Sequence, residues 1–279
     1  MRLPSVVIPA VSRGRGLVSP TRGPDRDLLW VYDRPVLHFA IEEAAAAGAD
    51  RIIIVSQTEA QAIRQYLNGA EAPRITAELI LVVPDRPAGP ADALACAREH
   101  VLPGPVGVIL PEDVIMGASC LGQMAQAYTA GHMIAAKMAP PEETSRDGSA
   151  CLSGPAQVLA TPACAPPDRP VAQGASATLA AVGRYVLDRA ILDRLTCTPW
   201  GDLGQEQLTA AIDADARHVP LTAFRFAGQH FPCSGHDGLL AATQARRRIV
   251  RQAGAKNVTP ARMGSHRGCH GPTPPSYRA

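Results

Sequence analysis

The stretch from Ile8 to Pro35, IPAVSRGRGLVSPTRGPDRDLLWVYDRP, decides how this chain is interpreted. It starts in an apolar run that predicts a buried strand. It then continues into a loop rich in glycine and arginine: Arg13, Gly14, Arg15, Gly16, Arg22 and Arg26. Glycine lets backbone N–H groups approach phosphate oxygens, and guanidinium groups neutralise their charge, so the loop predicts a site for a phosphorylated ligand. A solvated basic loop is the alternative, because a third glycine and a Gly-Lys-Ser/Thr sequence are both missing.

Strands and helices alternate along the first half of the chain. Apolar runs predict buried strands, and helical patterns lie between them, with Gly48 in the position of a left-handed cap. The repeated β-α-β spacing predicts a mostly parallel sheet with helices on both faces, whose ligands bind at the carboxyl ends of the strands. The predicted strands are Ser5–Ala10, Arg51–Val55, Glu78–Val83 and Val106–Leu110, and the predicted helices are Pro35–Ala47, Thr58–Leu67 and Pro90–His100.

The second half resumes this order after a segment rich in proline, serine and glycine, Ala139–Gln173, which predicts irregular hairpins or a mobile loop. We expect helices at Leu121–Thr129, Asp188–Leu195, Gln205–Ala216 and His236–Ala253, and strands at His132–Met138, Leu179–Leu187 and Pro220–Phe226. Residues 1–254 are predicted to form one domain. Residues 255–279 carry basic residues but no acidic ones, and predict a disordered basic tail.

Composition indicates an ordinary soluble protein. The chain has 279 residues with 46% hydrophobic content and a net charge of +2, which argues against general nucleic-acid binding. We expect no membrane span and no signal peptide, and seven scattered cysteines suit a reducing cytoplasm. Cys233 and His236 form a zinc-like pair with His266 and Cys269-His270, but these partners fall in the predicted tail, so coincidence is the preferred interpretation.

The opening stretch resembles the signature of the bacterial UTP–glucose-1-phosphate uridylyltransferases, members of the sugar-phosphate nucleotidyltransferase family. That signature reads roughly IPVAGLGTR-x-LPATKAIPKEMLPxVDKP and aligns without a gap. Further family motifs follow in the same order: GPADALACA from Gly89, VILPEDVI from Val108, LAAVGRYVL from Leu179 and GDLGQEQLTAAI from Gly201. The resemblance covers residues 3 to about 250 and implies a Rossmann-like nucleotidyltransferase fold, with a mostly parallel, mixed sheet.

The resemblance implies transfer of UMP from UTP to glucose 1-phosphate, which gives UDP-glucose and pyrophosphate. Such a reaction needs positioned cations around the phosphates. Here Gly16 stands in place of the family's phosphate-binding arginine, and the neighbouring Arg15 or Arg13 is the expected substitute. Arg15, Arg26 and Arg169 are the expected catalytic cations. The resemblance places Arg13, Gly14, Arg22 and Gly89 at the nucleotide.

The resemblance also implies a magnesium ion, for which Glu112 and Asp113 are the candidate ligands. A solvated turn at the end of a strand is the alternative interpretation of this pair. The family's second metal-binding aspartate falls at Pro232, which has no side-chain ligand atom, and Asp237 is a poor replacement on the following helix.

Substrate recognition differs from the family as well. Pro84 stands where a uracil-reading glutamine is expected, which leaves another nucleotide such as dTTP open. The resemblance places Gly183, Gln205 and Glu206 at the sugar, with Gln205 in place of a glutamate.

Two interpretations of these changes stay open. The chain is either a working uridylyltransferase, with reduced activity, or a catalytically impaired paralogue that binds nucleotide or sugar phosphate and acts as a regulatory or scaffolding subunit. As the family commonly forms dimers or tetramers, we expect a homo-oligomer, or a hetero-oligomer with an intact paralogue.

Overall fold

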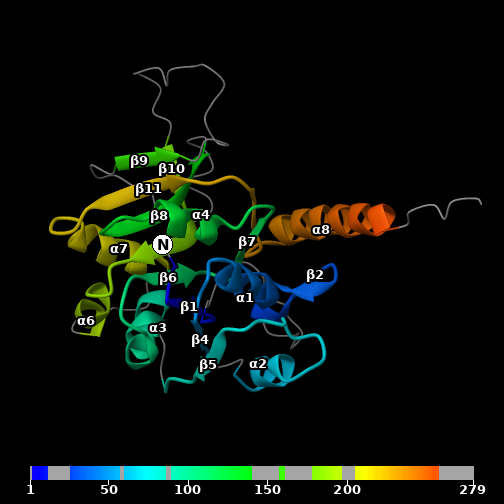
Figure 1. Cartoon of the computed structure of the whole chain (residues 1–279), viewed down its shortest axis with the longest axis horizontal. Coiled ribbons are helices and arrows are strands. Elements are labelled where there is room, and N and C mark those ends of the chain that lie inside the picture. Colours follow the sequence, from blue (N-terminus) through cyan, green and yellow to red (C-terminus); the bar gives the residue numbers. More distant parts are fainter. Residues whose placement is uncertain are drawn as a thin grey trace, which may run out of the picture.

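The computed structural model describes residues 2–11, 26–56, 60–85, 89–139, 157–160, 178–196 and 205–257. Within these residues one eight-stranded sheet runs through the molecule, in the order β5–β4–β1–β6–β10–β8–β11–β9 (Figure 1). Its strands are β1 (Ser5–Pro9), β4 (Arg51–Val55), β5 (Glu78–Val82), β6 (Val106–Ile109), β8 (His132–Ala139), β9 (Gln157–Ala160), β10 (Thr178–Leu187) and β11 (Leu221–Arg225).

The sheet is mixed and mostly parallel, as the alternation of strands and helices predicts. β5, β4, β1 and β6 are parallel to one another, and so are β8, β11 and β9. β10 runs antiparallel to both β6 and β8, and therefore joins the two parallel groups. The carboxyl ends of β1, β4, β5 and β6 consequently share one edge of the sheet.

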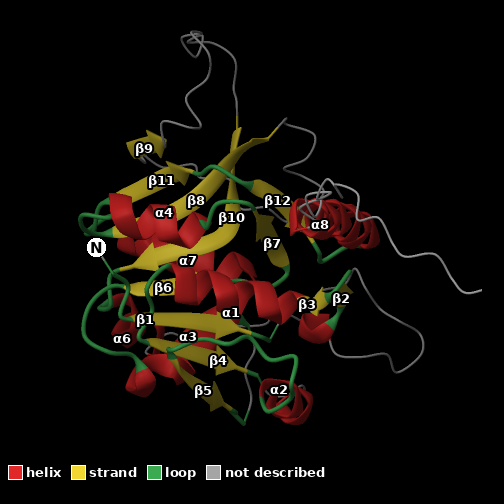
Figure 2. Ribbon diagram, turned by 45° about the vertical axis from the view of Figure 1, so that its right-hand side comes forward, coloured by secondary structure: helices red, strands yellow, loops and turns green. Residues whose placement is uncertain are grey.

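Helices cover both faces of the sheet, which confirms the prediction (Figure 2). α1 (Val36–Ala46) and α4 (Cys120–Ala127) pack on one face, against side chains such as Ile8 and Ile54. α3 (Pro90–Ala97), α6 (Ile191–Thr196) and α7 (Gln205–Asp215) pack on the other, against side chains such as Val7 and Ile53. Successive residues of a strand point to opposite faces, so the continuous apolar runs of β1 and β4 fill both cores.

The element boundaries differ from the predicted ones in a few places. The predicted helix at residues 90–100 is divided into α3 and the 3-10 turn η2 (Arg98–His100). Of the predicted helix at Thr58–Leu67 the structure describes Ala60–Leu67, which is α2. α8 spans His236–Asn257, past the predicted domain boundary at residue 254. Gly48 has φ +82° after α1, as expected for a left-handed cap. Most of the 139–173 segment and the tail beyond Asn257 lie outside the described residues.

Two small sheets were not expected from the sequence. β2 (Trp30–Val31) and β3 (Arg34–Pro35) form a hairpin before α1, after the turn η1 (Arg26–Leu28). β7 (Asp113–Met116) pairs antiparallel with β12 (Gln229–Pro232), although more than a hundred residues separate them along the chain. This second pair places the start of α8 beside the predicted acidic site.

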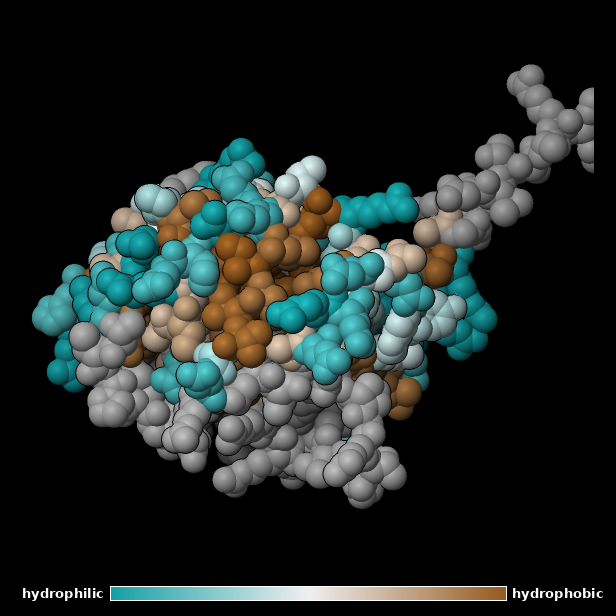
Figure 3. Space-filling model, turned by 90° about the horizontal axis from the view of Figure 1, so that it is seen from below, coloured by the Kyte–Doolittle hydropathy of each residue, from teal (hydrophilic) through white to brown (hydrophobic). Residues whose placement is uncertain are grey.

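The edge strand β5 carries partly exposed apolar side chains. Val83, the residue after the strand, is 49% exposed. Figure 3 shows the face on which β5, α2 and α3 lie, with apolar side chains gathered near its middle. No helix of the described residues is long and apolar enough to cross a membrane.

Candidate active site

The candidate site lies at the edge where β1, β4, β5 and β6 end. Ala10 donates its N–H to Val55 at 2.8 Å and Ser56 donates to Val82 at 3.1 Å, so the ordered ladder continues to this edge. Gly89 is buried there as the N-cap residue of α3, and Glu112 and Asp113 follow β6. Crevices at the carboxyl ends of parallel strands are where such sheets bind ligands.

The structure describes only part of the predicted site. The predicted phosphate-binding residues Arg13, Gly14, Arg15, Arg22 and Arg169 lie outside the described residues, as does Gly16. Arg26 begins η1, and Gln205 and Glu206 begin α7, but only the backbone of these three residues is described. Their roles toward nucleotide and sugar therefore stay predictions.

Asp113 is held by two hydrogen bonds at the start of β7. Its Oδ1 lies 2.6 Å from Nε2 of His230, and its Oδ2 accepts from the backbone N–H of Gly183 at 3.1 Å. Burial acts to raise the pKa of the Asp113 carboxyl. The hydrogen bond and charge of His230 outweigh that effect, with help from Arg184 and Gly183, and hold the pKa below its usual range. The carboxylate is therefore ionised at neutral pH.

The β7–β12 ladder sets what lies next to Asp113. Pro232 is its direct partner across the ladder, and His230 is the partner of Ile115. The N–H of Cys233 donates to the carbonyl oxygen of Glu112 at 2.7 Å and extends the pairing by one more contact. Pro232, where the resemblance predicts the family's second metal-binding aspartate, thus lies directly opposite Asp113.

The residues at the β7–β12 junction, where Asp113 lies opposite Pro232, do not fit a magnesium site. Both oxygens of Asp113 already accept hydrogen bonds, from His230 and Gly183, and Pro232 offers no ligand atom. Across the described ranges, no group of three or more His, Cys, Asp or Glu side chains is arranged to hold a metal ion. Within these ranges, the side chains around Asp113 do not by themselves supply the oxygen-rich coordination that magnesium prefers.

A buried ion pair that sequence reasoning missed holds the junction together. Arg184 on β10 is 1% exposed, and its Nε donates to Oε2 of Glu43 on α1 at 2.9 Å. Its other N–H groups donate to the carbonyl oxygens of Leu110, Gly183 and Asp113 at 2.7–3.0 Å. The sequence does hold a signal for this pair: Arg184 lies within the apolar segment LAAVGRYVL, and Glu43 within VLHFAIEEAAA. Charged side chains in buried segments need partners, so the two segments predict an ion pair.

Glu43 connects this pair to a third element. Its Oε1 accepts from the backbone N–H of Leu121 at 2.9 Å, in the first turn of α4, where N–H groups lack partners within the helix. One carboxylate therefore joins α1, α4 and β10. The network fixes the turn between β6 and β7, and with it the position of Asp113.

Replacing Gly183 with alanine is expected to lower the free energy of unfolding by about 1–3 kcal/mol, the range for overpacking a core. A Cβ at this position would lie 2.5 Å from Oδ2 of Asp113 and 2.6 Å from Cβ of Leu110. Urea denaturation measures the loss. Gly235→Ala is the matched control, since nothing lies within 4 Å of its added Cβ. Equal stability of the two variants would contradict this close packing. Gly183 is thus required by packing, whatever it contributes to sugar binding.

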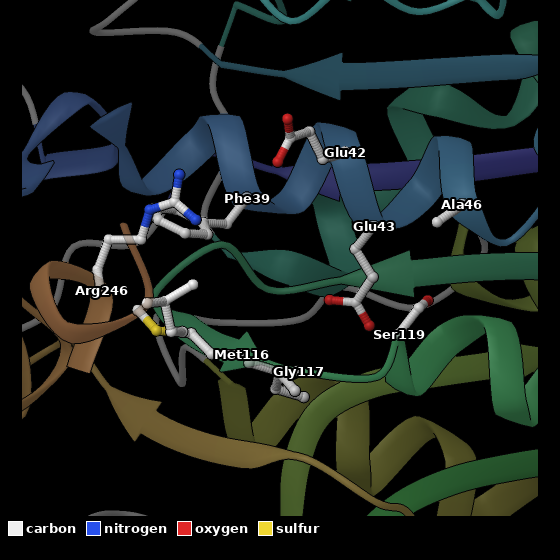
Figure 4. A pocket seen from close by; sticks show the side chains of 10 residues that line it. Phe39, Glu42, Glu43, Ala46, Met116, Gly117, Ser119 and Arg246 are labelled. Atoms are coloured by element: carbon white, nitrogen blue, oxygen red, sulfur yellow. The ribbon is translucent and has the colours of Figure 1, made fainter. Parts of the chain in front are cut away.

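A pocket of about 460 Å³ lies between α1, β7 and α8 (Figure 4). Its charged residues are already in ion pairs: Glu43 with Arg184, Glu42 with Arg34, and Arg246 with Asp33. None of the predicted site residues whose side chains the structure describes lines it. Its lining is Phe39, Glu42, Glu43, Ala46, Ile115, Met116, Gly117, Ser119, Arg246 and Ile249. Among the described residues, the pocket therefore does not include Gly89, Glu112 or Asp113, which lie at the sheet edge where the nucleotide is expected.

Comparison with known proteins adds three findings. A family model described as nucleotidyl transferase matches residues 13–220. A UTP–glucose-1-phosphate uridylyltransferase from Komagataeibacter xylinus is 30% identical over 254 residues, which cover 83% of this chain and 89% of that protein. One from Pseudomonas aeruginosa is 25% identical over 266 residues, with 85% and 93% covered.

The fold is also similar to solved structures. A UDP-glucose pyrophosphorylase complexed with UDP-glucose superposes with a TM-score of 0.71 at 21% identity, covering 88% of this chain and 99% of the other. A UTP-bound UGPase from Acinetobacter baumannii gives a TM-score of 0.72 at 21% identity, covering 92% and 100%. At this level of identity the likeness establishes the fold.

Proposed function

This chain belongs to the nucleotidyl transferase family, and from that premise we propose that it transfers UMP from UTP to glucose 1-phosphate. A phosphate oxygen of the sugar phosphate attacks the α-phosphorus and forms a new P–O bond. The bond between the α-phosphorus and the oxygen that bridges the α- and β-phosphates breaks, and its electron pair leaves with pyrophosphate. No covalent enzyme intermediate is needed, so the protein acts by holding anions in line and neutralising their charge.

The observation that carries this proposal is the likeness to the Komagataeibacter uridylyltransferase along most of both chains. The sheet edge supports it, since Gly89, Glu112 and Asp113 lie at the ends of the parallel strands. Under the proposal, Arg15, Arg26 and Arg169 neutralise the phosphates, and Gly14, Arg13, Arg22 and Gly89 lie at the nucleotide. Gly183, Gln205 and Glu206 contact the sugar.

One observation favours a second candidate function. Pro232 faces Asp113 across the ladder, and His230 already contacts that carboxylate, which is the expected state of a site that has lost an ion-binding carboxylate. A paralogue that binds UTP or UDP-glucose without efficient turnover would have this site. A cytoplasmic location, and a homo-oligomer or a hetero-oligomer with an intact paralogue, belong to the same proposal.

We expect the protein to bind UTP or UDP-glucose in calorimetry, with affinity that falls as salt is raised, because charge neutralisation contributes to binding. Arg26→Ala should weaken binding by roughly 1–3 kcal/mol, the range for losing a hydrogen bond to a charged group. Arg217→Ala, at an exposed position just after α7, is the matched control.

A pyrophosphate-release assay with UTP and glucose 1-phosphate separates the two candidates, and dTTP in a parallel arm tests the nucleotide. Release of pyrophosphate together with UDP-glucose supports the transferase. Binding without release supports the impaired paralogue. If no nucleotide or nucleotide sugar gives heat at millimolar concentration, both candidates are wrong.

A further inference from the structure

His230 is placed against Asp113 by the register of a two-stranded sheet. In an antiparallel pair, residues on a diagonal still lie within reach of long side chains. Since Pro232 is directly opposite Asp113, His230 two positions earlier is such a diagonal neighbour. The contact between its Nε2 and Oδ1 of Asp113 is 2.6 Å long. Both side chains are largely buried, His230 with 10% and Asp113 with 14% exposure.

The contact with Asp113 is the polar anchor of the imidazole ring. Nδ1 of His230 is buried and makes no hydrogen bond to any atom that the structure describes. Asp113 also accepts the Gly183 N–H on its second oxygen. Each oxygen thus has one of its two acceptor positions filled by a protein donor. A metal ion would have to share this carboxylate with the imidazole and with a backbone N–H of β10, beside a position, Pro232, that supplies no ligand atom.

The neighbouring groups reinforce this arrangement. Arg184 donates to the backbone oxygen of Asp113, and its own charge is paired with Glu43. Burial raises the pKa of the Cys233 thiol to about 12, so this side chain stays neutral beside the carboxylate. Both carboxylate oxygens of Asp113 therefore contact protein donors, and the Arg184 guanidinium donates to its backbone oxygen.

We propose that His230 takes the position of a divalent cation at this junction, so that Asp113 binds no metal ion in this chain. The two features then belong together. β12 has proline where the second metal ligand is expected, and it also carries the histidine that contacts Asp113, the expected first ligand. This inference concerns the free protein. It holds or fails independently of which nucleotide the site accepts, and of whether turnover occurs.

Titration with Mn²⁺ alone, followed by the EPR signal of the free ion, tests the proposal on the full chain. The natural protein and Pro232→Asp should show no Mn²⁺ binding that Asp113→Asn removes. The double variant His230→Ala/Pro232→Asp should bind Mn²⁺ at least about tenfold more tightly than Pro232→Asp, a difference of about 1.4 kcal/mol. Adding Asp113→Asn to the double variant should abolish that gain. His236→Ala, an exposed histidine at the start of α8, replaces His230→Ala in the matched control.

The natural protein offers a second measurement that needs no variant to fold. The ring nitrogen shifts of His230 in ¹⁵N NMR should not change when Mg²⁺ is added to saturation. Displacement of these shifts by Mg²⁺ would overturn the proposal, and so would Asp113-dependent Mn²⁺ binding by the natural protein. A folded double variant with no gain over Pro232→Asp would overturn it as well.

Discussion

Replacing Arg184 with methionine is expected to lower the free energy of unfolding by about 3–5 kcal/mol, the loss typical of breaking one half of a buried ion pair. The substitution leaves the Glu43 carboxylate, which is 8% exposed, without its guanidinium. It also removes the donors to the carbonyl oxygens of Leu110, Gly183 and Asp113. Urea denaturation at neutral pH measures the loss.

Two further variants separate this effect from lost packing. Glu43→Gln keeps an acceptor for the Leu121 N–H and removes the charge, so Arg184→Met/Glu43→Gln should lose less than the sum of the single variants. Arg247→Met, at an exposed position of α8, should change stability by no more than about 0.5 kcal/mol. Strictly additive losses for the two buried residues would show that the pair is not coupled.

The sequence allowed prediction of the fold wherever apolar patterning was continuous. The runs RIIIV in β4 and VGVI in β6 are long enough to identify buried strands, and their spacing implies parallel pairing. Gly48 marked the end of α1 because a positive φ favours glycine. The order of the family motifs then gave the fold class, which the structure confirms.

The strands β7 and β12 could not be predicted in the same way. The sequence of β12 is QHFP, which has a proline and no sustained alternation, and proline within a run argues against a strand. Its pairing with β7 is a long-range contact, so nothing local in either segment specifies it. The family pattern predicts an aspartate at the position of Pro232, but it does not predict the contact of His230, which depends on this register.

The sequence pattern predicts the position of Asp113 in the fold but not its hydrogen-bond partners. Asp113 does lie at the carboxyl edge of the sheet, as the placement after β6 implies. Residue type alone could not show that its two oxygens accept bonds from His230 and from the backbone of Gly183. Burial makes the difference: a carboxylate at the surface stays available to a metal, whereas a largely buried one is stable only with fixed donors.

This arrangement has a consequence for rate. Loss of one preorganised electrostatic contact commonly lowers turnover by about a hundred- to a thousandfold. UDP-glucose formation by the natural chain is therefore expected to be about a hundred- to a thousandfold below the median enzyme value of about 10 per second. Steady-state assays with saturating UTP, glucose 1-phosphate and Mg²⁺ measure it. Turnover near that median would show that other residues neutralise the phosphates fully.

The double variant His230→Ala/Pro232→Asp should raise Mg²⁺-dependent UDP-glucose formation by at least about tenfold, which is only about 1.4 kcal/mol of barrier. Neither single variant should do so, because Pro232→Asp leaves Asp113 bound to its imidazole and His230→Ala leaves the second carboxylate missing. Groups that act as a unit give such non-additive effects on rate. His236→Ala/Pro232→Asp is the matched control, and thermal denaturation establishes that each variant is folded. A folded double variant that gains Mn²⁺ binding but no turnover would place the rate limit outside this junction, at the arginines around the phosphates.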